Sequence, residues 1–70
     1  MRNIEISKEP IELYKLLKFT GMSSSGAEAK SVISEGRVLV NGKIETRKRK
    51  KLVSGDIIEF GEDKVCLQLK

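Results

Sequence analysis

The sequence has no histidine, no tryptophan and a single cysteine among its 70 residues. Without histidine the chain lacks the commonest general base and the commonest transition-metal ligand, which argues against an enzyme. Cys66 alone can form neither an internal disulfide nor a cysteine metal cage, and its place in the alternating stretch KVCLQL indicates a packing role. We therefore expect no catalytic residue, no metal and no cofactor.

Long apolar runs are also missing. No segment approaches the roughly 18 consecutive apolar residues that span a bilayer, and the N-terminal stretch MRNIEISKEP lacks the apolar core of a secretory signal. The glycine-rich spacing with a Lys-Ser/Thr ending that marks a nucleotide loop does not occur either. We expect a cytoplasmic protein with no membrane partner and no small-molecule substrate.

Aromatic residues are scarce, since the chain has one tyrosine and two phenylalanines. Single-strand binding proteins stack bases on several aromatic side chains, and the three rings here do not suggest such a platform. Tyr14 and Phe19 could stack on unpaired bases, but a small core has first claim on both rings, so packing inside the protein is the interpretation we favour.

Composition is that of a small folded domain with a basic surface. An apolar content of 39% supplies one modest core, although a chain of this length buries only about 60% of its unfolded surface. We expect a single domain over residues 1–70. A net charge of +4 at neutral pH predicts an acidic partner, and nucleic acid fits better than an anionic membrane because no strongly amphipathic basic helix is evident.

Two helices are predicted in the first half of the chain. The first covers about residues 10–19, with Pro10 at its first position, Gly21 as its stop and an apolar stripe of Leu13, Leu16 and Leu17. The second begins with the capping box of Ser25 and Glu28 and ends at Gly36. Its buried face consists of Ala29, Val32 and Ile33.

From residue 37 the apolar period changes to two, which is typical of strands. Val38 and Val40 share one face, and Asn41-Gly42 is the strongest turn signal of the chain. Further strands are predicted at residues 57–60 and 65–69, after turns at 54–56 and 61–63, and the opening stretch RNIEI can form a short strand. The fold class is therefore α+β, a two-helix hairpin packed on a small, mostly antiparallel sheet.

Five consecutive cations follow the hairpin, in the stretch TRKRKK at residues 46–51. Like charges repel and add nothing to a core, so folding alone does not explain them. A solvated loop or a nuclear-import signal is an alternative, but phosphate binding is the interpretation we favour. If the run is extended, one face carries Arg47, Arg49 and Lys51 and the other carries Lys48 and Lys50. Because an arginine can fork onto a phosphate, we weight Arg47 and Arg49 above their neighbours.

The loop SSSG before the second helix is a further candidate. Ser23, Ser24 and the first helical amides can surround a phosphate at the positive end of the helix. Capping alone also explains Ser25. Asp56, in the Gly-Asp pair, is expected to form a turn rather than to act in catalysis.

The stretch SSSGAEAKSVISEGRVLVNG, followed by VSGDII, resembles the alpha-L RNA-binding motif first seen in ribosomal small-subunit protein S4. Eleven positions match that family pattern without a gap: Ser25, Ala29, Val32, Ile33, Gly36, Val38, Val40, Asn41, Gly42, Gly55 and Asp56. The motif recurs in pseudouridine synthases, bacterial tyrosyl-tRNA synthetases and ribosome-associated heat-shock proteins. The chain looks most like the standalone bacterial members, in which a segment such as ETRKRKKL is a familiar feature.

The resemblance implies an RNA grip without catalysis, acting on structured ribosomal or transfer RNA, with the ribosome as a further possible partner. The family arginine that faces phosphates is Gly26 here, and Lys30, one helical turn later, can present a charge to the same region. The expected RNA-binding residues are Ser24, Ser25, Lys30, Arg37, Lys43, Arg47, Lys48, Arg49, Lys50 and Lys51. Two alternatives remain, an adaptor that docks an acidic protein and a non-specific binder of duplex DNA.

Overall fold

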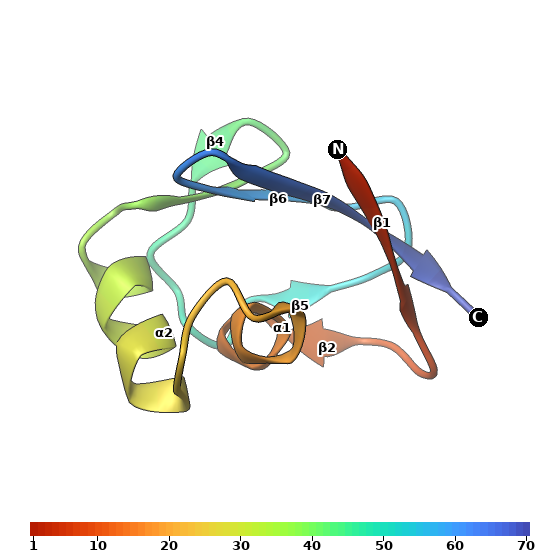
Figure 1. Ribbon diagram of the computed structural model, residues 1–70, viewed down its shortest axis with the longest axis horizontal. Helices are drawn as coiled ribbons and strands as arrows, with labels where there is room; N and C mark the ends of the chain where they lie inside the picture. The colour runs from red at the N-terminus through yellow and green to blue at the C-terminus, as the bar shows by residue number, and fades with distance from the viewer.

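Two short helices lie on one side of a mixed sheet in the computed structural model, which describes residues 1–70 (Figure 1). The helices are α1 (Leu13–Thr20) and α2 (Gly26–Ser34). The strands are β1 (Arg2–Ile6), β2 (Ile11–Glu12), β3 (Val38–Val40), β4 (Lys43–Ile44), β5 (Lys51–Leu52), β6 (Ile57–Phe60) and β7 (Asp63–Leu69). Neither helix has the length and apolar character needed to cross a membrane.

The larger sheet has the strand order β1-β7-β6-β3-β4, and its only parallel pair is β1 with β7. The predicted α+β class, with two helices and a mostly antiparallel sheet, is confirmed. A second sheet, β2 with β5, was not predicted, because each of its strands has two residues and shows no period. Its pairing brings Ile11 opposite Leu52 and so ties the start of α1 to the middle of the chain.

The core lies between the helices and the larger sheet. The predicted apolar faces of both helices are buried, as are Val38 and Val40 of β3. From the other strands the sheet adds Ile58, Val65 and Leu67, each fully buried. One cluster of 14 buried apolar residues therefore joins every long element.

The predicted start of the first helix was wrong. Pro10 lies outside the helix, and residues 11–12 are extended because they pair with β5. Leu13 and Tyr14 are the first two helical residues, and their amides donate to the carbonyls of Lys50 (2.9 Å) and Lys48 (3.0 Å). A distant segment thus supplies the acceptors that a capping side chain would otherwise provide.

The Asn41-Gly42 turn is confirmed, with φ of 53° and 83°, the positive values that a primed hairpin turn requires. The Asn41 side chain donates to Asp56 Oδ1 (3.0 Å) and accepts from Ile57 N (2.9 Å), while Asp56 Oδ2 accepts from Val53 N (2.9 Å). Asp56 therefore forms a turn, as predicted. The turns that contain Asn41-Gly42 and Gly55-Asp56 are therefore joined by hydrogen bonds of the Asn41 side chain.

The expectation for the aromatic residues was wrong for Phe19, whose side chain is 65% exposed. The leucine stripe occupies the buried face of α1, and Phe19 lies outside it. Tyr14 is only partly buried, at the edge of the core.

Candidate nucleic-acid interface

The five cations at residues 47–51, here called the basic segment, form a turn rather than an extended strand. Lys50 N donates to Arg47 O (3.1 Å), and only Lys51 belongs to a strand. The alternation of side chains that an extended run would give therefore does not apply. Because the carbonyls of Lys48 and Lys50 cap α1, the main chain of the basic segment is fixed to the fold at two points.

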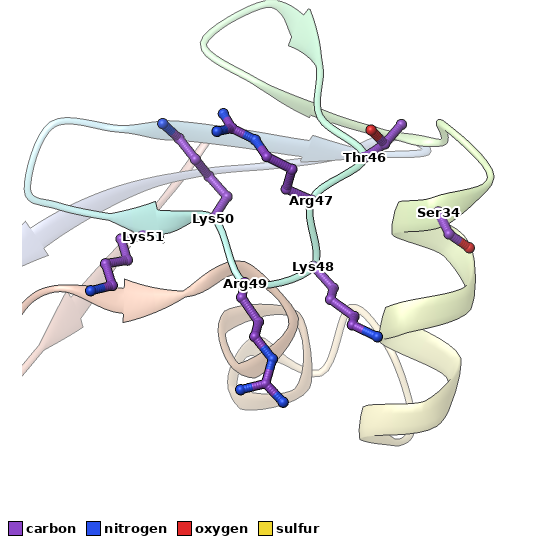
Figure 2. A pocket seen from close by; sticks show the side chains of 7 residues that line it. All are labelled: Ser34, Thr46, Arg47, Lys48, Arg49, Lys50 and Lys51. Carbon is purple, nitrogen blue, oxygen red and sulfur yellow. The ribbon is translucent and has the colours of Figure 1, made fainter.

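The side chains of the basic segment border an open groove of about 750 Å³ (Figure 2). Lys48 and Arg49 extend toward the helices, whereas Arg47 and Lys50 extend toward the larger sheet (Figure 2). The remaining lining residues are Ser34, Thr46 and Lys51. No apolar side chain lines this groove, so its chemistry is that of a cationic, hydrated surface.

Arg47 is occupied by an acid two residues away. Its guanidinium donates to both carboxylate oxygens of Glu45, from Nε at 2.9 Å and Nη2 at 3.1 Å, and its main-chain amide donates to Oε2. These hydrogen bonds hold the pKa of the Glu45 carboxyl below its usual range and raise the pKa of Arg47. A phosphate at Arg47 therefore has to compete with the Glu45 carboxylate, and the contact of Arg47 with RNA stays a prediction.

The other four cations of the basic segment are freer. Arg49 is 3.9 Å from Glu12, at the outer limit of an ion pair, and Lys48, Lys50 and Lys51 form no ion pair. A free lysine on a fixed main chain keeps its charge available to a ligand.

Lys30 of α2 joins this surface through Tyr14 of α1. The Lys30 ammonium lies 4.7 Å from the centre of the Tyr14 ring, and the Arg49 guanidinium lies 6.0 Å from the same point. One ring thus connects α1, α2 and the basic segment by cation–π contacts. Sequence reasoning considered Tyr14 but assigned it to the core, although its place outside the leucine stripe of α1 was a visible signal.

The polar groups of the loop SSSG at residues 23–26 already form hydrogen bonds within the protein. Ser25 Oγ accepts from Glu28 N (3.1 Å), which confirms the cap, but the Glu28 carboxylate reaches back to Ser24 N (3.0 Å) and Ser24 Oγ (3.2 Å). Ser23 is buried, so its side chain is not available to a phosphate. A phosphate at Ser24 and Ser25 has to compete with this carboxylate, and their contact with RNA stays a prediction.

Two further predicted residues do not line the groove. Arg37 pairs with Glu35 (3.4 Å) and lies 5.3 Å from the Phe60 ring centre, and Lys43 is exposed on β4. Gly26 begins α2, and a Cβ atom added there would meet no other atom within 4 Å. No group of three or more His, Cys, Asp or Glu side chains is placed to hold a metal ion.

Residues 4–68 match the family model of the S4 domain. The chain belongs to the S4 domain family. Among curated proteins, this S4 domain is 49% identical over 61 residues to the "Putative RNA-binding protein YbcJ" of Escherichia coli, covering 86% of this chain and 87% of that protein. It is 41% identical over 57 residues to the "Probable ribosome maturation protein RlbA" of Bacillus subtilis, covering 81% and 80%.

Among solved structures, the solution structure of YbcJ from E. coli has a TM-score of 0.74 and 45% identity to this S4 domain, and covers 97% of this chain and 87% of that one. It is described as revealing an alpha-L motif involved in RNA binding. The family and the fold inferred from the sequence motif are thereby confirmed.

Proposed function

We propose that this S4 domain is a non-catalytic RNA-binding protein that holds structured RNA through its phosphates. The observation that carries the proposal is the basic segment, whose main chain is fixed by the Leu13 and Tyr14 amides while its lysines stay unpaired. Pre-positioned cations lose less conformational freedom on binding than those of a flexible tail.

Structured RNA is the polyanion that we propose for this surface. An A-form helix hides its base edges in a deep groove but presents closely spaced phosphates, so affinity comes from charge and selectivity from shape. The names of the relatives support RNA as the ligand class and the ribosome as its setting. Ribosomal RNA is therefore the source that we propose first. Transfer RNA remains within the proposal, and so does a cytoplasmic location.

The contributions of the cations should be unequal. Lys48, Lys50 and Lys51 are free to engage phosphates, and Arg49 and Lys30 extend the surface toward the helices. Arg47 contributes less while Glu45 holds it. The remaining members of the predicted set lie at the periphery of this arrangement: Ser24, Ser25, Arg37 and Lys43.

The test is fluorescence anisotropy of a labelled hairpin RNA as a function of salt. Four or five phosphate contacts predict a log–log slope of about −3 to −4, a loss of about a hundredfold in affinity between roughly 50 and 200 mM salt. The double variant Lys48→Gln/Lys51→Gln should make the slope shallower by about 1.5. Lys8→Gln/Lys70→Gln is the matched control, because both lysines are exposed, unpaired and absent from the groove.

A salt-independent response, or the same slope change in both double variants, contradicts the proposal. Equal affinity for duplex DNA and duplex RNA would identify a non-specific binder. The acidic-partner adaptor would be identified instead if the protein binds no RNA but captures a protein from lysate, and if competitor RNA leaves that capture unchanged.

A further inference from the structure

Tyr14 is the only tyrosine of the chain, and it lies within the cationic surface rather than inside the core. Three cations surround its ring: Lys30 at 4.7 Å, Lys15 at 5.9 Å and Arg49 at 6.0 Å from the ring centre. They come from α2, α1 and the basic segment, respectively. Phosphate binding alone requires no aromatic ring at the point where these three elements meet.

The Tyr14 side chain packs partly against the core, and its hydroxyl end faces away from the core. The Tyr14 amide donates to Lys48 O (3.0 Å), which holds the main chain. Its hydroxyl makes no hydrogen bond within the protein, yet no buried side-chain polar atom lacks a partner. The hydroxyl end of the ring must therefore reach the surface.

We propose that Tyr14 is a stacking site for an unpaired nucleobase of the bound RNA. The proposal rests on the proposed function and adds a ligand class to it: single-stranded nucleotides in a loop, bulge or end next to a helical stem. Nucleobases stack on tyrosine with little sequence preference because every base has a π-face.

The surrounding cations make such stacking compatible with phosphate binding. Lys30 reaches the ring through a flexible stem, so its ammonium can move to a phosphate when a base takes its place over the ring. The Arg49 guanidinium is planar and can bind the neighbouring phosphate or cover the outer face of the base. The base and the phosphate of one nucleotide are then bound by the Tyr14 ring and by cations that lie 4.7 and 6.0 Å from its centre.

Phe19 provides the matched comparison on the same helix. It is the more exposed ring, at 65%, yet it has no cation–π partner and lies beside a different groove, next to residues of β2 and the preceding loop. If exposure alone decided base stacking, Phe19 would be the better site. The cations favour Tyr14.

The first experiment uses the intrinsic fluorescence of the unmodified protein, which reports on Tyr14 alone because the chain has no tryptophan and no other tyrosine. Three RNAs are compared: a hairpin with a short loop, the same hairpin with an abasic loop, and a blunt duplex of matched absorbance. We expect strong quenching by the first RNA only. The abasic hairpin keeps the loop phosphates, so equal quenching by both hairpins would overturn the stacking site while leaving phosphate binding intact.

The second experiment measures hairpin affinity for ring variants. Tyr14→Leu should weaken binding to the intact hairpin by about five- to a hundredfold, whereas Tyr14→Phe, which keeps the ring, should stay within about twofold. Phe19→Leu should have no effect. The abasic hairpin should not distinguish Tyr14→Leu from the parent protein.

The outcomes separate the two proposals. Salt-dependent hairpin binding that is equal for Tyr14→Leu and the parent protein overturns the stacking site but keeps the proposed function. Absence of binding to all three RNAs overturns both. A melting curve of each variant shows whether a loss of affinity comes from unfolding, and the quenching result does not depend on any variant.

Discussion

Replacing Glu45 by glutamine should tighten RNA binding, although the change removes an ion pair. Glu45 holds the Arg47 guanidinium through two side-chain hydrogen bonds of 2.9 and 3.1 Å. The side chain of Glu45 is only 13% exposed, while that of Arg47 is 70% exposed and lines the groove. Glutamine keeps an oxygen for the Arg47 amide but removes the negative charge, so the guanidinium can turn to a phosphate.

The size of the effect follows from the gain of one phosphate contact. Such a contact steepens the salt slope by about 0.7–0.9, and the released counterion corresponds at 0.1 M salt to a factor of about five to eight in affinity. We expect a severalfold increase at low salt that shrinks as salt rises. Thermal stability should fall slightly, because the ion pair is at the surface and screened by solvent.

The assay is hairpin anisotropy at several salt concentrations for Glu45→Gln and for the control Glu5→Gln. Glu5 is exposed on β1, at the opposite edge of the sheet from β4, and the two variants change the net charge equally. A gain of the same size in both variants would mean that net charge alone is responsible. An unchanged or weaker affinity for Glu45→Gln would refute the reasoning that Glu45 withholds Arg47 from RNA.

Three further predictions concern pH and stability. The pKa of Glu45 is lower in the folded chain than in the unfolded one, so its stabilising contribution is present above about pH 4.5 and is lost as pH falls through the lowered value. The melting temperature should therefore decrease as the pH is lowered from about 4.5, and it should decrease less steeply for Glu45→Gln. RNA affinity should change by less than about twofold between pH 6 and 8, because the chain has no histidine. Asp56→Ala removes the acceptors of Asn41 Nδ2 and Val53 N and should lower the free energy of unfolding by about 1–2 kcal/mol, or roughly 5–15 °C in melting temperature by calorimetry. Hairpin affinity at low temperature should stay near the parent value. A large loss of affinity in the folded variant would contradict a turn role for Asp56.

Features that depend on a few neighbouring residues were predictable. The Ser25 cap, the buried faces of both helices and the Asn41-Gly42 turn each depend on local spacing and backbone preference, and the structure confirms them. The interaction of Glu45 with Arg47 was also within reach, since residues two apart share a face in an extended stretch. It was missed because the cations were weighed without the acid beside them.

Features that depend on distant segments were not predictable. The first helix starts at Leu13 because Ile11 and Glu12 pair with β5, about forty residues later. The same pairing places Lys48 and Lys50 where their carbonyls cap the helix. No local pattern encodes a two-residue strand or an acceptor that comes from another part of the chain.

The sequence by itself determined the family, the order of the main elements and the presence of a concentrated positive charge, because spacing, turn chemistry and composition are local properties. Only the tertiary structure decided how that charge is presented: which cation is held by an acid, which remain free, and which aromatic ring lies among them. The physical reason is that ion pairs and cation–π contacts act over a few ångströms in space, and the folding of α1 and α2 against the basic segment sets those distances.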